Sequence, residues 1–418
     1  MVNKKTQYLQ AAFTLACTIC RDAIWSNKSC NWIGNTNEDF YGMPKNYAKA
    51  LGTNFYDGTA GVAFFLTAML QLQKNTVIEK TVAGAFQQII DKELQLQSEH
   101  EYLYGKLGFY TGWPGCIYVL LYAANALNRP DYYDAARQLT EKCMQLPEQY
   151  WGLDIIDGAA GAITAFAAIY RKQPDARLKD FIVSLGAYLL TKADKKPGSI
   201  SWDTMAEKTN NLTGYAHGAA GFAHAFTELY NVTEDEAYLK IVRDIVAYED
   251  GHFNSSQQNW PDFRKYETAY APAQSTEQVC GVAWCHGAPG IGLSRLRSYQ
   301  ITHDVSFIRD VDIAVQTTIK AATADLLGNY SLCHGLFGNA ELLLCAADVF
   351  QRAELRQQAE QLGEECFNRF ILKQLPLPNG LQTLSDTPDF MLGSSGIGYF
   401  FLRLVDPKKF PCMLLISQ

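Results

Sequence analysis

The segment DGAAGAITAFAAIY, residues 157–170, places two glycines three residues apart directly before an apolar stretch of helical length. The same arrangement occurs seven times along the chain. The stretches that follow are apolar on almost every position, which is typical of helices buried on all sides. The glycine pairs are Gly58/Gly61, Gly112/Gly115, Gly158/Gly161, Gly218/Gly221, Gly287/Gly290, Gly335/Gly338 and Gly393/Gly396.

The spacing of these pairs predicts a ring of helices. Successive first glycines lie 54, 46, 60, 69, 48 and 58 residues apart, which suits two helices and two loops per unit. The intervening segments are amphipathic and predict outer helices with one solvated face. A helix that is apolar all round must be covered on every side, so we expect a closed, all-α fold: an α/α toroid of seven helical hairpins, forming one domain over residues 1–418. An open solenoid or two separate bundles are the alternatives. The predicted outer helices are 80–97, 132–145, 176–193, 234–249, 305–324 and 353–370.

Composition narrows the class of protein. The chain has 418 residues, of which 48% are hydrophobic and 19% charged, a balance that excludes a disordered protein. The net charge is -7 and Lys and Arg are scattered, which argues against a nucleic-acid-binding protein. Eleven cysteines without dense spacing favour reduced thiols in the cytoplasm. No apolar run is long enough to span a bilayer. Leu9, Phe13, Ala16 and Cys20 fall at helical spacing, so we expect one amphipathic N-terminal helix rather than a signal peptide.

The two residues before each first glycine form a column that concentrates the chemistry. In a closed ring these pairs lie at equivalent places at one end. Three of the seven histidines occupy this column, and two Cys-His pairs fall on adjacent repeats. The pairs are Tyr56-Asp57, Tyr110-Thr111, Ile156-Asp157, Ala216-His217, Cys285-His286, Cys333-His334 and Met391-Leu392.

Thiolate and imidazole in register on neighbouring repeats predict a zinc site. We expect the ligands to be Cys285, Cys333 and His334, with His286 as the alternative to His334. Three protein ligands and one open position are typical of catalytic zinc. Two thiolates and a neutral imidazole leave the site formally neutral, which suits activation of a thiol better than activation of water.

Several motifs give the chain a family resemblance. These are residues 214–218 (GYAHG), 284–290 (WCHGAPG) and 333–335 (CHG). With them the chain resembles the lanthionine cyclase (LanC-like) family over about residues 31–401. Further segments resemble the C-terminal cyclase domain of bifunctional, class II lanthipeptide synthetases, notably 30–34, 56–58, 259–264 and 290–296.

The resemblance implies a reaction. Zinc on Cys285, Cys333 and His334 would activate a peptide Cys thiol, which adds to dehydroalanine or dehydrobutyrine and forms a thioether ring. His217 would protonate the enolate, and Asp154 would orient or charge-balance that His. His286 is a further candidate for catalysis. The partners implied are a dehydrated precursor peptide with its leader, a separate dehydratase (one toroid fills the 418 residues) and export machinery at the inner membrane face.

The sequence also departs from the family. Members like nisin cyclase carry Arg where this chain has Gly281, which leaves stabilisation of the enolate to another group. Arg264 is a candidate for that role. Two alternatives keep the zinc: a protein that adds glutathione to dehydrated residues, and a non-catalytic peptide-binding scaffold.

Other residues have plainer interpretations. We interpret Asp57 and Asp157 as caps of the inner helices and His224 as a core residue. Either Asp, with Asp154, would also serve a helical-toroid glycoside hydrolase, although the Cys-His column argues against one. The polar stretch 251–276, with Trp260 and Phe263, is a loop over the site or a surface excursion.

Overall fold

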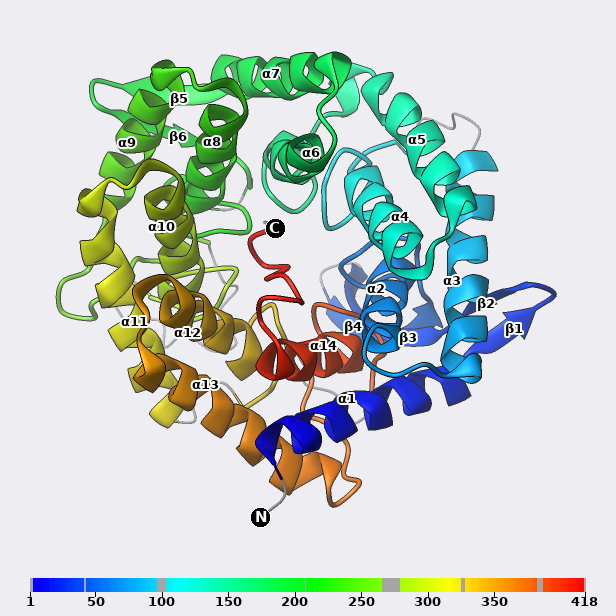
Figure 1. Ribbon diagram of the computed structural model, residues 1–418. Helices are drawn as coiled ribbons and strands as arrows, with labels where there is room; N and C mark the ends of the chain where they lie inside the picture. The colour runs from blue at the N-terminus through cyan, green and yellow to red at the C-terminus, as the bar shows by residue number, and fades with distance from the viewer. Residues whose placement is uncertain are drawn as a thin grey trace.

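The molecule is organised around seven inner helices, each of which begins directly after one of the first glycines (Figure 1). The computed structural model describes residues 3–40, 43–95, 103–206, 208–264, 279–324, 328–381 and 386–416, without the side chains of 36–40 and 43–46. The inner helices are α2 (Thr59–Leu70), α4 (Trp113–Leu127), α6 (Ala159–Lys172), α8 (Ala219–Thr233), α10 (Ala288–Thr302), α12 (Leu336–Phe350) and α14 (Ser394–Val405).

A second ring of helices surrounds the first. Each of the first six inner helices packs against the outer helix that follows it, and α14 packs against α1 (Lys4–Arg21) and α2. The two ends of the chain therefore close the ring, and the predicted α/α toroid and N-terminal helix are confirmed. The remaining outer helices are α3 (Thr76–Gln95), α5 (Pro130–Met144), α7 (Ala176–Thr191), α9 (Glu236–Asp250), α11 (Ile308–Thr323) and α13 (Ala353–Cys366). Short turns of helix are η2 (Glu148–Tyr150), η3 (Val305–Phe307) and the π-helix η4 (Phe367–Ile371).

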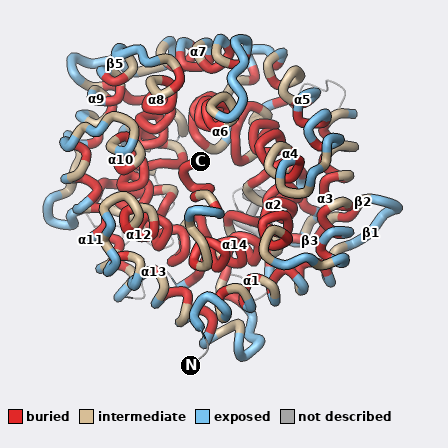
Figure 2. The backbone as a smooth tube through the Cα atoms, in the orientation of Figure 1, coloured by how far each residue is buried: buried red, intermediate tan, exposed pale blue. Residues whose placement is uncertain are grey.

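Burial follows the sequence pattern (Figure 2). Every residue of α2 is buried, whereas α9 buries only Leu239, Val242, Ile245 and Glu249 along one side. Each large apolar side chain of an inner helix contributes about 1.5–3 kcal/mol by leaving water. The inner ring thus forms a central part of the hydrophobic core.

The structure also contains three short antiparallel hairpins, which were not predicted from the sequence. They pair β1 (Ile24–Ser26) with β2 (Ser29–Asn31), β3 (Ile33–Phe40) with β4 (Met43–Ala50), and β5 (Ala193–Lys196) with β6 (Ser199–Trp202). β1 is fully exposed, so it lacks the alternation of apolar and polar residues by which a strand is recognised.

Backbone hydrogen bonds join the seven loops that precede the inner helices. In each loop, the backbone N–H of the first residue of the column pair, or of the residue before it, donates to a carbonyl oxygen of the next loop. The seventh loop donates in the same way to the first. This closed circuit rules out an open solenoid. The bonds run from N–H to carbonyl oxygen as Tyr56 to Tyr110 (2.9 Å), Tyr110 to Ile156 (3.1 Å), Ile155 to Ala216 (3.3 Å), Ala216 to Cys285 (3.1 Å), Cys285 to Cys333 (3.3 Å), Cys333 to Met391 (2.9 Å) and Met391 to Tyr56 (2.9 Å).

The glycine pairs permit the tight approach of each loop to its helix. A Cβ at Gly158 would lie 2.2 Å from the Leu153 nitrogen, and one at Gly161 would lie 2.2 Å from the Ile155 oxygen. Both distances are far below van der Waals contact. Because Gly158 and Gly161 have no side chain, the loop folds back over the first turn of α6.

The C-terminal segment fills the centre of the ring (Figure 1). Cys412, Met413, Leu414 and Ile416 are buried there. The hydroxyl of Tyr110 donates to the Met413 carbonyl at 2.9 Å, and the Trp284 indole donates to the Leu414 carbonyl at 3.1 Å. The segment therefore supports the loops at the end of the ring where the column lies.

Candidate metal centre

A cavity of about 570 Å³ lies at the end of the ring where the inner helices begin. Both members of the column line it in several repeats, as the sequence predicts. The lining residues are Tyr56, Asp57, Thr111, Ile156, Ala216, His217, Asp262, Arg264, Gly281, Val282, Ala283, Cys285, His286, Cys333 and His334.

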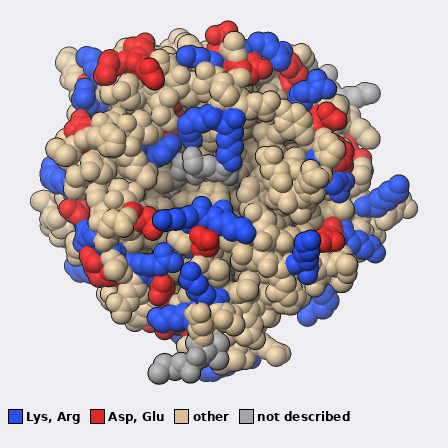
Figure 3. Space-filling model, in the orientation of Figure 1, with Lys and Arg blue, Asp and Glu red and all other residues tan. Residues whose placement is uncertain are grey.

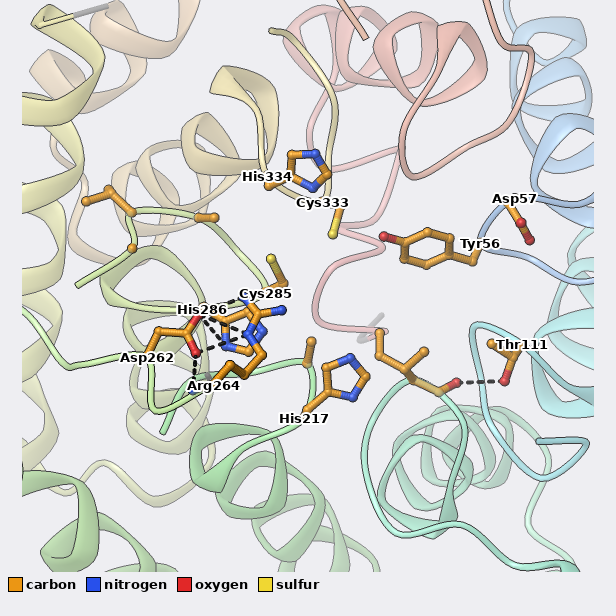
Figure 4. Close-up of a pocket in the computed structure, with 15 residues that line it drawn as sticks. Tyr56, Asp57, Thr111, His217, Asp262, Arg264, Cys285, His286, Cys333 and His334 are labelled. Atoms are coloured by element: carbon orange, nitrogen blue, oxygen red, sulfur yellow. Dashed lines mark hydrogen bonds and ion pairs between the residues drawn. The ribbon is translucent and has the colours of Figure 1, made fainter. Parts of the chain in front are cut away.

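Three of these side chains form a compact group of metal donors. The donor atoms of Cys285, Cys333 and His334 all lie within 4.8 Å of one another, and Figure 4 shows the three side chains converging. Within the described ranges, no fourth His, Cys, Asp or Glu joins this group. The backbone bond from Cys285 to Cys333 holds the two loops in register.

The orientation of His334 leaves one ring nitrogen for a metal. Its Nε2 lies 2.7 Å from the carbonyl oxygen of Gly380, so Nε2–H donates and Nδ1 keeps its lone pair. Two sulfurs and one imidazole nitrogen at this spacing fit a tetrahedral zinc ion, with bonds of about 2.3 Å to sulfur and about 2.0–2.1 Å to nitrogen. Gly380 is a site residue that the sequence analysis missed.

The two thiols differ in acidity. A hydrogen bond with Cys333 and burial hold the pKa of Cys285 well above its usual value. The hydrogen bond from Cys285 lowers the pKa of Cys333, and one from Tyr56 adds to this against the effect of burial. Tyr56, whose hydroxyl points toward Cys333 in Figure 4, also escaped prediction as a site residue. Its place in the column was the available signal.

His217 lines the cavity and forms a hydrogen-bonded pair with Asp154. Nδ1 of His217 lies 2.6 Å from Oδ2 of Asp154. The other oxygen, Oδ1, accepts from the backbone N–H groups of Ile156 and Asp157 at 2.9 and 3.1 Å. Burial lowers the pKa of His217, but the hydrogen bond and charge of Asp154 outweigh it, and the pKa is raised overall. Asp154 therefore favours the protonated form of the His217 imidazole.

His286 lies outside the three-donor group. Its side chain is 5% exposed, and Nδ1 is 3.7 Å from Oδ2 of Asp262. Burial, with the nearby Arg264 guanidinium, lowers the pKa of His286 to about 3, so the ring is neutral. This geometry favours His334 over His286 as the third donor.

Arg264 brings a cation to the cavity wall. Its guanidinium is held by Asp262, with Nη2 at 2.6 Å from Oδ2 and Nε at 3.1 Å from both carboxylate oxygens (Figure 4). Gly281 also lines the cavity, and its carbonyl accepts from Asn259 Nδ2 at 2.9 Å. The positive charge at this wall therefore comes from Arg264, which precedes Gly281 in the chain.

Among the plainer interpretations, the one for Asp57 and Asp157 is wrong and the one for His224 is confirmed. The N-caps of α2 and α6 are Gly58 and Gly158, and no side chain caps either helix, so Asp57 and Asp157 are not caps. His224 is a core residue, fully buried beside the Tyr215 hydroxyl at 2.6 Å.

Trp260 and Phe263 are buried, which excludes a surface excursion at these residues; 265–278 lie outside the described residues. Asp154 and Asp157 hydrogen-bond to each other in one turn instead of facing each other across the cavity, unlike a glycosidase pair.

Sequence comparison identifies the family. A profile of the family described as "Lanthionine synthetase C-like protein" matches residues 49–415. The chain belongs to this family. Its lanthionine synthetase C-like part covers all seven inner helices and the whole column.

Individual relatives have low sequence identity to this chain. The lacticin 481/lactococcin biosynthesis protein LcnDR2 of Lactococcus lactis subsp. lactis is 23% identical over 86% of this chain. Glutathione S-transferase LANCL1 of Danio rerio is 27% identical over 48% of this chain. The chain spans 37% and 45% of the lengths of these two relatives.

A solved structure shows the same fold in the family. Nisin cyclase superposes with a TM-score of 0.66 at 18% identity, over 87% of this chain and 92% of that chain. This lanthionine synthetase C-like toroid contains, in the ranges described, no helix long and apolar enough to cross a bilayer.

Proposed function

We propose that residues 1–418 form one zinc-dependent cyclase that adds peptide Cys thiols to dehydroalanine or dehydrobutyrine and so forms lanthionine or methyllanthionine rings. One observation carries this proposal: three metal donors converge at a cavity that also presents a His paired with a buried Asp. A thiol and a dehydro residue bound together in that cavity would meet both groups.

Cys285, Cys333 and His334 would hold the metal. Zinc bound there would lower the pKa of a peptide thiol and keep the sulfur nucleophilic at neutral pH. Tyr56 would donate a hydrogen bond to the Cys333 sulfur and moderate its charge. Gly380 would fix the tautomer of His334 through its carbonyl.

The remaining residues would stabilise the transient negative charge and supply the proton. When the sulfur bonds to the β-carbon, the π electrons of the double bond move to the α-carbon and its carbonyl oxygen. His217, whose protonated form Asp154 favours, would give its proton to the α-carbon. Arg264 would face the oxygen that carries the transient negative charge, in place of a cation at Gly281. His286, neutral and buried behind Arg264, would position that guanidinium and shape the wall.

The partners follow from this chemistry. The substrate would be a precursor peptide with its leader, dehydrated by a separate dehydratase before it reaches the cavity. We place the reaction in the cytoplasm, with contact to export machinery at the inner membrane face when the product leaves.

The relative LANCL1, which is named a glutathione S-transferase, favours one second candidate, addition of glutathione to a dehydrated residue. One assay separates the two functions. The purified protein is incubated with zinc, glutathione and a peptide that contains one dehydroalanine and one Cys. Cyclisation removes the free thiol at unchanged peptide mass, whereas the alternative adds the mass of one glutathione. If the peptide keeps its free thiol and its mass, as it does in a control without protein, both proposed functions are wrong.

A further inference from the structure

A second cavity, of about 820 Å³, lies at the opposite end of the ring, where the inner helices end. Lys and Arg side chains flank the central hollow of this face in Figure 3. Two cysteines from distant parts of the chain line the cavity: Cys345 on α12 and Cys412 on the C-terminal segment. Their sulfurs and a carboxylate oxygen of Glu341 all lie within 4.8 Å of one another.

The surroundings of this group disfavour a metal ion. Both carboxylate oxygens of Glu341 accept hydrogen bonds from Arg403, at 2.8–3.0 Å. The same guanidinium donates to the Cys345 sulfur at 3.6 Å. A divalent cation would have to displace Arg403 from Glu341 and would sit beside its positive charge. Two thiols in contact next to a guanidinium suit oxidation to a disulfide better.

The two sulfurs differ in access. Cys345 is half-buried and faces the cavity, whereas Cys412 is buried and hydrogen-bonds with Cys345. Burial raises the pKa of Cys412 well above its usual value, so this thiol keeps its proton. An oxidant in the cavity therefore meets Cys345 first, and Cys412 is placed to resolve the product.

Cys412 is connected to the metal centre through the two residues that follow it. The Met413 carbonyl accepts from the Tyr110 hydroxyl, and the Leu414 carbonyl accepts from the indole of Trp284, the neighbour of Cys285. Arg403 also donates to the carbonyls of Pro407 and Phe410 and so fixes the start of the segment. The segment thus connects the thiol pair to the floor of the metal cavity.

We propose that Cys345 and Cys412 form a reversible disulfide that fastens the C-terminal segment to α12. The oxidant is a peroxide. The Cys345 sulfur attacks one peroxide oxygen, the O–O bond breaks and Cys345 becomes a sulfenic acid, while the departing hydroxide takes the Cys345 thiol proton and leaves as water. The Cys412 sulfur then attacks the Cys345 sulfur, the S–O bond breaks, and the Cys412 proton leaves with the hydroxide as water. Two thiols and one hydrogen peroxide give one disulfide and two waters. This inference does not depend on the proposed cyclase activity.

The test is a thiol map of the zinc-loaded full-length protein after graded hydrogen peroxide, alkylation and digestion without reduction. A cross-linked Cys345–Cys412 peptide, two hydrogens lighter than its two reduced parts, is expected, and dithiothreitol should return both thiols. Cys345→Ser should abolish this peptide, whereas Cys17→Ser, which removes an exposed thiol on α1, should leave it unchanged.

Two results of the thiol map would overturn the proposal. In the first, Cys345 and Cys412 are both alkylated at a peroxide dose that oxidises Cys17. In the second, Cys345 is oxidised to a sulfinic acid while Cys412 is still free. A loss of one zinc per chain in Cys345→Ser would point to a metal site and also contradict it. The melting temperature gives a second measurement: it should rise by several degrees on oxidation of the wild type and stay unchanged in Cys345→Ser.

Discussion

The backbone N–H of Met391 donates a hydrogen bond of 2.9 Å to the carbonyl oxygen of Tyr56 and joins the last loop of the ring to the first. Met391 also accepts, through its carbonyl, from the N–H of Cys333. One metal donor is therefore held by a loop that the chain reaches only after completing the circuit. Formation of the donor group and closure of the ring are coupled.

Removal of the C-terminal segment should destabilise the whole ring. Deletion of residues 411–418 would uncover the space now filled by Met413, Leu414 and Ile416, each at most 1% exposed. At about 1.5–3 kcal/mol for each side chain, the loss is comparable with the total stability of a typical domain. We expect a fall of at least about 10 °C in melting temperature, or insoluble protein. A truncation of Ser417 and Gln418 alone is the control, and equal effects of the two deletions would contradict this role.

His217→Asn should separate metal binding from turnover. The side chain lies outside the donor group, so zinc content should remain at one per chain, while loss of the proton donor should reduce the rate about 10²–10⁴-fold. Zinc analysis and the cyclisation assay measure the two effects. A zinc-free variant would instead make His217 a ligand.

Asp154→Asn should move the pH profile in a defined direction. The carboxylate raises the pKa of His217, and its removal should lower that pKa. If the protonated imidazole is the active form, as proposed, activity should then be lost at a lower pH as the solution becomes alkaline. The rate at acidic pH should change less. Asn still offers an oxygen to the N–H groups of Ile156 and Asp157, so a uniform loss at every pH would indicate a structural role.

Gly380→Ala should weaken metal binding through His334. A Cβ at this position would lie 3.1 Å from His334 Nε2 and 2.8 Å from a methyl carbon of Leu392, so the Leu392 side chain must shift and the His334 ring is crowded at the nitrogen that donates to Gly380. Loss of such an orienting bond typically costs 10–100-fold in zinc affinity, measured by competition with a chelator. The matched control is Gly52→Ala, whose Cβ would meet only the Asn54 amide at 3.5 Å. The same affinity in both variants would remove Gly380 from the site.

The fold could be predicted from the sequence because each inner helix has the same local pattern of two glycines at its start. Gly158 and Gly161 mark the start of α6, and an equivalent pair of glycines marks the start of every inner helix. The column brings Cys285, Cys333 and His334 together for the same reason: equivalent residues of neighbouring repeats must meet in a ring.

The missed features depend on contacts between repeats. Gly380 acts through a backbone carbonyl, which every residue has, and it lies far along the chain from His334. Tyr56 reaches Cys333 only because the ring closes. The cap assignment of Asp57 failed because glycine itself occupies the cap position, with the side chain of Asp57 held instead by Asn54 at 2.8 Å.

X-ray absorption at the zinc edge tests directly whether Cys285, Cys333 and His334 hold one zinc ion and leave a position for a peptide thiol. We expect one zinc per chain with two sulfurs at about 2.3 Å and one nitrogen at about 2.0–2.1 Å, and a third sulfur once a Cys-containing substrate peptide is added. A Cys285→Ala/Cys333→Ala variant that still binds one zinc, or a wild-type spectrum that gains no sulfur from the peptide, would show that these residues do not form such a site.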